Sequence, residues 1–197
     1  MNHNEIVFND FLEYLNLLSP IPERELLKLK KLCTLSQINK GDHFIRQGDN
    51  TTKFAFVSSG LFRFVYLSED GKEFTKSFID KKSFLTSYSS LLENRESFFS
   101  IEALEDSTLI LIDFYAWKRL FEDEISWNKL YIKLLEKLYI QKEEREKEFL
   151  LYDAKERYEI FLEKFQNLDK RVKQYQIASY LGITSVALSN LRKELKN

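Results

Sequence analysis

The spacing of apolar residues changes twice along this chain, and these changes constrain the fold more than any other feature. Between Phe8 and Leu35 apolar residues recur every three to four positions, with a break at residues 19–22 (SPIP), which predicts two short helices. From Ile38 to Asp113 short runs of Phe, Ile, Val and Tyr are separated by turn signals, and beyond Asp113 the helical spacing returns. The sequence therefore predicts an α+β protein with its strands between helices.

The central block contains several short strands. Turn signals occur at residues 40–42 (KGD), 47–49 (QGD), 58–60 (SSG) and 69–71 (EDG), and such regular spacing is typical of an antiparallel barrel or sandwich. Phe62, Phe64 and Tyr66 alternate with Arg63, Val65 and Leu67. Gly71 can adopt the positive φ that a tight reversal needs before Phe74 and Phe78. This segment is predicted to be a β-hairpin.

A long helix should follow the strands. Trp127, Tyr131, Leu134 and Leu138 step by four, three and four residues, and other apolar residues nearby widen this stripe. Because the stripe is too wide for one partner, we expect the helix to pack on its own barrel and on a second copy, with these four residues at the dimer interface. Residues 141–148 (QKEEREKE) are polar, so the helix should project into water. A capping box at Asp153 predicts a new helix over 154–165, with a hinge before it.

The last segment has the layout of a helix-turn-helix. Ala178 allows a close helix crossing, Gly182 can end the first helix in the left-handed region, and Thr184 can cap the second. The residues expected to face inward are Ile177, Leu181, Ile183, Leu188 and Leu191. The outward residues of the second helix would meet base edges in a major groove. An ordinary helical hairpin has the same spacing, and that alternative stays open.

The charge distribution favours nucleic acid at this end. The net charge is only −1, but residues 170–197 hold six basic residues and one acidic residue, which gives +5 and leaves −6 for residues 1–169. Phosphate neutralisation supplies most of the non-specific affinity for DNA. The basic residues are Lys170, Arg171, Lys173, Arg192, Lys193 and Lys196. A solvated, lysine-rich helix end would look the same by charge alone.

A family resemblance rests on fragments spread over the chain. They are Lys40-Gly41-Asp42, Gln47-Gly48-Asp49, and residues 56–63 (FVSSGLFR), 69–73 (EDGKE), 101–107 (IEALEDS) and 177–183 (IASYLGI). In this order the chain resembles the Crp-Fnr superfamily of transcription regulators. The resemblance implies an N-terminal antiparallel β-barrel of the double-stranded β-helix or jelly-roll type with flanking helices (1–123), a dimerisation helix and hinge (124–152), and a C-terminal helix-turn-helix domain with a short or missing wing (153–197).

The family's nucleotide-binding cassette is degenerate here. Nucleotide-binding members carry a Gly-Glu pair and a later Arg, and the matching positions hold Ser87, Tyr88 and Ser97. A buried phosphate without a cationic partner is costly to desolvate, and Arg95 would reach the site only through a shifted loop. We expect no response to cyclic AMP or cyclic GMP. The side chains that fill or line the tentative effector pocket are Phe84, Ser87, Tyr88, Ser97, Phe98 and Phe99.

The recognition helix also departs from the family. Many relatives have Glu and Arg where this sequence has Val186 and Asn190; Asn190 can pair with adenine and Val186 can touch a thymine methyl, so we expect an A·T-rich site. The expected DNA-binding residues are Lys170, Arg171, Lys173, Thr184, Ser185, Val186, Ser189, Asn190 and Lys193. The partners that the resemblance implies are double-stranded DNA, a second copy in a homodimer, RNA polymerase and an unknown small-molecule effector.

Other functions fit the sequence less well. Cys33 is the single cysteine, and the histidines are His3 and His43, so iron-sulfur, multi-thiolate metal and haem sites are disfavoured. A cupin-type enzyme would need paired histidines. We expect no catalytic residue, metal or cofactor, and a cytoplasmic protein without a membrane span. The alternative that stays open is a ligand- or protein-binding signalling module whose helix-turn-helix no longer reads DNA.

Overall fold

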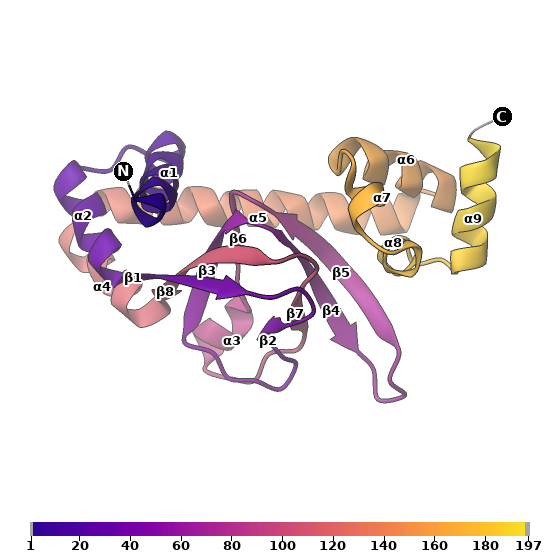
Figure 1. Cartoon of the computed structure of the whole chain (residues 1–197), viewed down its shortest axis with the longest axis horizontal. Helices are drawn as coiled ribbons and strands as arrows, with labels where there is room; N and C mark the ends of the chain where they lie inside the picture. The colour runs from indigo at the N-terminus through magenta and orange to yellow at the C-terminus, as the bar shows by residue number, and fades with distance from the viewer. Residues whose placement is uncertain (1, 196–197) are drawn as a thin grey trace.

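The computed structural model describes residues 2–195 and consists of a central pair of sheets flanked by helices (Figure 1). Lys196, counted above in the basic end, lies outside these residues. The N-terminal helices are α1 (His3–Leu18) and α2 (Glu23–Leu32). Residues 33–35 were expected to continue the helical region but begin β1 (Cys33–Ile38), because they pair with β8 (Ser107–Asp113), with Leu35 opposite Ile110.

The strands form two four-stranded antiparallel sheets. The first has the order β1-β8-β3-β6 and the second the order β2-β7-β4-β5. Within residues 2–195 no ladder joins the two sheets, so the predicted barrel is an open jelly-roll sandwich whose layers share a core that includes Val57, Phe62, Ile101 and Leu109. The remaining strands are β2 (His43–Ile45), β3 (Lys53–Ser59), β4 (Leu61–Leu67), β5 (Glu73–Asp80), β6 (Ser83–Leu85) and β7 (Ser100–Ala103).

The predicted hairpin is confirmed. Strands β4 and β5 pair antiparallel from Leu61 opposite Asp80 to Leu67 opposite Glu73, and Gly71 has φ 80° in the turn. The register shifts between Phe64 and Val65, so Lys76 is an extra residue on β5 without a partner in the ladder. The hairpin lies at the edge of the second sheet, because β5 is the last strand in its order.

Helices cover the outer face of the first sheet. Apolar residues of α1, α2, α4 (Phe114–Asp123) and the start of α5 (Ile125–Leu151) pack against β3 and β8, with Phe11, Phe56 and Trp127 in one cluster. The short helix α3 (Tyr88–Glu93) lies between β6 and β7 in the chain. Helix α5 has 27 residues and extends past the sheets to the C-terminal helices (Figure 1). Its polar segment is mostly exposed, but Glu148 is buried beside Arg145.

The C-terminal region begins at the predicted capping box. The Asp153 side chain accepts from the amides of Lys155 and Glu156, and the Glu156 side chain accepts from the amide of Asp153. In residues 153–195 the described elements are helices: α6 (Ala154–Lys164), α7 (Leu168–Arg171), α8 (Gln174–Leu181) and α9 (Ser185–Glu194). They share an apolar cluster with Leu61 and Phe78 of the second sheet and with Leu104, which follows β7, so both sheets are covered on their outer faces.

Candidate nucleic-acid interface and β-sandwich

The turn between α8 and α9 has the predicted helix-turn-helix geometry. Gly182 has φ 70°, and the amide of Ile183 donates to the Ala178 carbonyl at 3.0 Å. The hydroxyl of Thr184 caps α9 by accepting from the Ala187 amide at 3.1 Å. Leu188 is fully buried. The sequence predictions for Gly182 and Thr184 are therefore confirmed as local structure.

The opposite face of α9 is open. Val186 is 71% exposed, Ser185, Asn190 and Lys193 are also exposed, and Ser189 is half-buried. These side chains share one face of a helix whose other face is fixed in the apolar cluster. Thr184 is exposed too, but its hydroxyl is engaged in capping. The arrangement presents small polar and apolar side chains outward, as a base-reading helix does.

The predicted phosphate-binding cations are divided between two environments. Lys170 and Lys173 are exposed. Arg171 instead pairs with the β-sandwich formed by β1 to β8: its Nε lies 2.8 Å from Glu105 Oε1, its Nη2 lies 2.8 Å from Glu105 Oε2, and its Nη1 bonds to Asp80. The bonds from Arg171 hold the pKa of Glu105 below its usual range. In this conformation Arg171 is occupied by carboxylates rather than free for phosphates.

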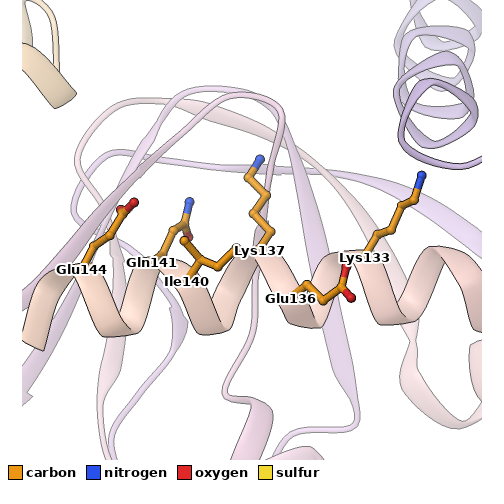
Figure 2. Close-up of a pocket in the computed structure, with 6 residues that line it drawn as sticks. All are labelled: Lys133, Glu136, Lys137, Ile140, Gln141 and Glu144. Atoms are coloured by element: carbon orange, nitrogen blue, oxygen red, sulfur yellow. The ribbon is translucent and has the colours of Figure 1, made fainter.

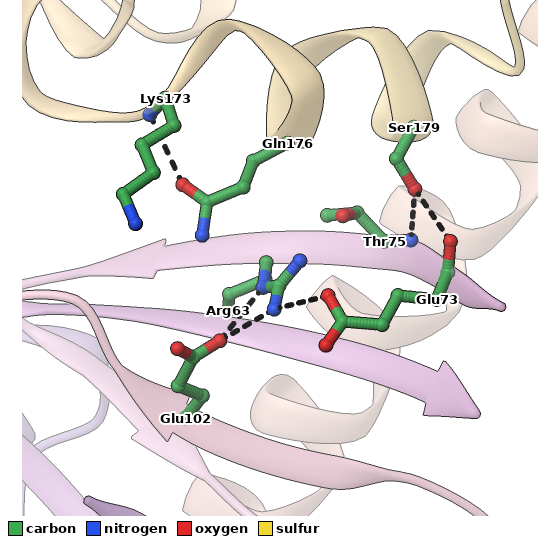
Figure 3. Close-up of polar contacts among 7 residues, drawn as sticks. All are labelled: Arg63, Glu73, Thr75, Glu102, Lys173, Gln176 and Ser179. Atoms are coloured by element: carbon green, nitrogen blue, oxygen red, sulfur yellow. Dashed lines mark hydrogen bonds and ion pairs between the residues drawn. The ribbon is translucent and has the colours of Figure 1, made fainter. Parts of the chain in front are cut away.

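Helix α8 lies against the edge strand β5 of the second sheet (Figure 3). The Thr75 amide donates to Ser179 Oγ at 2.8 Å, and Ser179 Oγ donates to the Glu73 carbonyl at 3.2 Å. A side chain of the helix thus satisfies backbone groups that an edge strand otherwise leaves to solvent. The helix-turn-helix packs on the β-sandwich at this edge.

A buried charge network lies beneath α8. Arg63 on β4 is 2% exposed, and its guanidinium bonds to Glu102 on β7, with Nε to Oε2 at 2.9 Å, and to Glu73 on β5, with Nη2 to Oε2 at 2.7 Å (Figure 3). A buried guanidinium needs such carboxylate partners, because an uncompensated charge is costly to remove from water. Gln176 of α8 is also buried and caps its own helix by accepting from the Lys173 amide.

The contacts that these residues make with the sheets were not predicted from the sequence. Arg171 is 66 residues from Glu105 and 91 from Asp80, and Ser179 is 104 residues from Thr75. No local spacing connects positions so far apart. The one available signal was that residues 1–169 are acidic and residues 170–197 are basic. This charge difference does not indicate which residues form pairs.

The degenerate cassette is closed by its own side chains. Ser87 and Ser97, at the positions where nucleotide binders carry ligand groups, are buried, and Ser97 Oγ donates to Ser87 Oγ at 2.8 Å. The Tyr88 hydroxyl bonds to the Tyr131 hydroxyl on α5. Arg95 pairs with Glu93 at 2.6 Å and lies over the Phe98 ring, so it does not take the place of the missing cassette arginine.

The three phenylalanines of the tentative effector pocket lie in different places. Phe84 packs with the helices on the first sheet, Phe98 is exposed, and Phe99 is buried between the sheets, stacked on Phe64 with 5.2 Å between ring centroids. The structure therefore does not bring the six predicted pocket residues together around one space.

The stripe predicted for dimerisation faces the chain's own core over most of its length. Trp127 is fully buried and its Nε1 donates to Glu25, and Tyr131 and Leu134 pack against the same cluster. Leu138 is exposed. Because Trp127 is fully buried in its own chain, it has no exposed surface to offer a second copy.

Another face of α5 is open instead. Ile125, Ile132 and Tyr139 recur every seven residues and are 65%, 53% and 62% exposed. Beside them a shallow hollow runs along the helix, and Figure 2 shows the residues that line it. They are Lys133, Glu136, Lys137, Ile140, Gln141 and Glu144. A seven-residue apolar repeat is typical of a helix that pairs with another helix.

Two further properties concern the described part of the chain. None of the helices between residues 2 and 195 has the length and hydropathy needed to cross a membrane. Over the same residues, His, Cys, Asp and Glu side chains do not gather in groups of three or more that could hold a metal ion.

Comparisons with known proteins identify the family of the β-sandwich. Residues 35–124 match the family model of the cyclic nucleotide-binding domain. No curated protein matches the chain. Among solved structures, FixK2 from Bradyrhizobium japonicum is similar with a TM-score of 0.72 and 17% identity, over 83% of this chain and 84% of that one.

Two other solved structures resemble the chain over most of its length. A protein from Eubacterium rectale, described as a transcriptional regulator of the Crp/Fnr family, has a TM-score of 0.73 and 17% identity, over 93% of this chain and 88% of that one. The c-di-GMP-responsive global regulator CLP of Xanthomonas campestris has a TM-score of 0.71 and 14% identity, over 89% and 92%. Residues 35–124 therefore form a cyclic nucleotide-binding-type domain, and the chain as a whole has the fold of the Crp/Fnr regulators.

Proposed function

We propose that this chain is a DNA-binding transcription regulator that acts as a homodimer. The observation that carries the proposal is the outer face of α9, where Ser185, Val186 and Asn190 are exposed while Leu188 on the inner face is buried. A helix that enters a major groove needs such an exposed face, with its opposite face fixed in the protein. The matched regulators support the class of function.

Three functional units follow from this proposal. Residues 1–123 would sense an effector, 124–152 would join two copies, and 153–197 would bind DNA in the cytoplasm, in contact with RNA polymerase. Lys170, Lys173 and Lys193 are assigned to phosphates, and Ser185, Val186, Ser189 and Asn190 to bases. Arg171 joins the phosphate set only when its bonds to Asp80 and Glu105 are released.

The dimer interface is assigned to the exposed seven-residue repeat of α5. Ile132 and Tyr139, with Leu135 between them, form an apolar seam on the side of the helix away from its own core. Two helices paired along this seam would hold two α9 helices for successive major grooves, about 34 Å apart on a near-palindromic site.

DNA binding is tested by titrating salt against affinity on a duplex pool. Each neutralised phosphate contributes about −0.9 to the slope of log affinity against log salt concentration, so a steep negative slope is expected. Lys193→Ala should weaken binding evenly on all sequences and flatten the slope. A flat response of the unaltered protein would contradict DNA contact.

Asn190→Ala tests base reading. The loss of a bidentate contact to adenine should remove about 1–3 kcal/mol of discrimination between sites and change non-specific binding little. Lys193→Ala is the matched control on the same helix face. An equal loss on every sequence would refute the assigned role of Asn190.

The competing function is a signalling module whose helix-turn-helix no longer reads DNA. The observation in its favour is that Arg171 is held by two carboxylates of the β-sandwich, those of Asp80 and Glu105. Selection from a random duplex library separates the two functions, because only a DNA reader enriches a common sequence.

A further inference from the structure

The C-terminal end of α8 leaves two backbone carbonyls for groups outside its own turn. The amides of Gly182 and Ile183 donate to carbonyls earlier in α8. Within residues 2–195 no backbone amide donates to the carbonyl of Tyr180 or Leu181. Carbonyls at a helix end need a capping group or water, because the helix has no further amides for them.

Two arginines outside α8 supply the missing donors. Arg145 lies on α5, and its Nη2 donates to the Tyr180 carbonyl. Arg157 lies on α6, and its Nε donates to the Leu181 carbonyl at 3.2 Å. Nη1 of Arg157 donates at 2.7 Å to the carbonyl of Tyr152, which follows the last residue of α5. Because cations also interact favourably with the C-terminal end of a helix dipole, two charged groups hold the end of α8 against α5 and α6.

The same arginines lie against an aromatic ring at the end of α5. The Arg145 Cζ is 4.1 Å from the ring centroid of Phe149 and 3.7 Å from that of Tyr180. The Arg157 Cζ is 5.3 Å from the Phe149 centroid, and such contacts of a guanidinium with a ring are attractive. The Phe149 ring also adjoins Gly182, where an added Cβ would lie 3.0 Å from it. The end of α5 therefore contacts the turn that leads into α9.

A buried carboxylate fixes the position of Arg145. Glu148 on α5 is 5% exposed, and its Oε2 accepts from Arg145 Nη1 at 2.6 Å. Its Oε1 lies 3.7 Å from Nζ of Lys164 on α6. Because a buried carboxylate is costly without cationic partners, Glu148 favours one orientation of α6 relative to α5. Both Arg145 and Glu148 belong to the polar segment 141–148, so part of this segment binds the C-terminal helices.

We propose that Arg145 and Arg157 are positioning residues that make the junction of α5 and α6 rigid, where the sequence predicts a hinge. Helices α8 and α9 would then keep one orientation relative to α5. Neither arginine belongs to the residues assigned to DNA, so both would act through the placement of α9. The inference rests on the proposed function: in a homodimer, two rigid junctions fix the separation of the two α9 helices and hence the spacing of the half-sites.

Pulsed EPR on the protein without DNA tests the rigidity of the junction. Spin labels are placed on exposed positions of α5 and α9 (Lys137→Cys and Lys193→Cys, in a Cys33→Ser background), and labelled chains are diluted with unlabelled ones so that distances within one chain are measured. One narrow distance distribution is expected. Arg157→Met, which keeps the apolar stem but removes every N–H donor, should broaden it. Lys155→Met, an exposed position on α6, is the matched control and should not.

DNA binding gives a readout that a merely structural role of Arg157 would not move. The half-sites obtained by selection are separated by one further base pair, which displaces and rotates one half-site against the other. This insertion should weaken binding of the unaltered protein about tenfold or more, because a rigid junction cannot follow the displaced half-site. For Arg157→Met the same insertion should weaken binding only about threefold or less, whereas both proteins should bind a single half-site equally.

Either a label distribution that stays narrow in Arg157→Met or an unchanged response to the inserted base pair would overturn the inference. An equal loss of affinity for the single half-site and the full site would show that Arg157 only supports folding. If Arg157→Met does not fold, Arg157→Lys takes its place and should also broaden the distribution, since it keeps the charge but has fewer donors. If the unaltered protein binds no duplex, the proposed function fails, and the label distances still decide whether the junction is rigid.

Discussion

At the scale of single residues, the contact of Arg171 with Glu105 joins the C-terminal helices to the β-sandwich. Both Glu105 carboxylate oxygens accept from the guanidinium at 2.8 Å, and the bonds hold the pKa of Glu105 below its ordinary value of 4.5. A carboxylate with a lowered pKa in the folded state stabilises the protein fully above its unfolded pKa. That contribution is lost as the pH falls through the folded value.

Glu105→Gln should therefore lower the free energy of unfolding at pH 7 by about 0.5–1 kcal/mol, the range for a partly exposed pair. Below pH 4.5 the difference from the unaltered protein should shrink, because its own Glu105 becomes protonated. Urea denaturation at pH 7 and pH 3 measures both values, with Glu69→Gln as an exposed control. A difference that is equal at the two pH values would rule out this role for the ion pair.

The residues that the sequence predicted well depend on neighbours in the chain. Gly182 and Thr184 were assigned from a turn and a cap that span a few residues, and both have those roles. Arg171 was assigned to phosphate from local charge, but its partners come from strands far earlier in the chain. Local chemistry is visible in a sequence, whereas a contact between distant segments depends on how they pack.

At the scale of elements, the turn between α8 and α9 connects to the end of α5. A Cβ added at Gly182 would lie 3.0 Å from Phe149 Cε1, and the φ of 70° is unfavourable for residues other than glycine. The turn is thus constrained both by its own backbone and by a ring from the long helix.

Gly182→Ala is expected to cost about 1–2 kcal/mol of stability, because alanine resists a positive φ and its methyl group crowds the ring. Gly182→Asn should cost less, since asparagine tolerates the left-handed region. Thermal denaturation of the two variants compares these costs. An alanine variant as stable as the parent would show that the turn can change its backbone conformation, and move away from the Phe149 ring, without a cost in stability.

For the long helix α5, the sequence predicts an apolar stripe but not which part of the stripe its own chain covers. Its apolar stripe was predicted to contact both its own core and a second copy; the contact with its own core is confirmed, and the contact with a second copy stays a prediction. Trp127, Tyr131 and Leu134 face the core of their own chain, and Ile132 and Tyr139 lie on the open side. The periodicity gives the width of an apolar face, whereas the N-terminal helices and sheet decide which part of it is covered.

At the scale of the whole molecule, the proposed dimer depends on the open side of α5. Tyr139→Glu would place a charge in an apolar seam, so it should shift the protein to monomers and weaken DNA binding through the loss of a second contact. Leu17→Glu, on the exposed side of α1, is the matched control. Sedimentation equilibrium measures the mass; a variant that stays dimeric places the interface elsewhere.

The apolar cluster shared by the second sheet and the C-terminal helices has a consequence for folding. Leu61, Phe78 and Leu104 are buried by residues such as Phe161 and Tyr180. Because neither region completes this cluster alone, the two should melt in one cooperative transition. Protease cleavage at Tyr152 should then leave a nicked but associated molecule, and a fragment expressed without residues 153–197 should aggregate through its uncovered sheet.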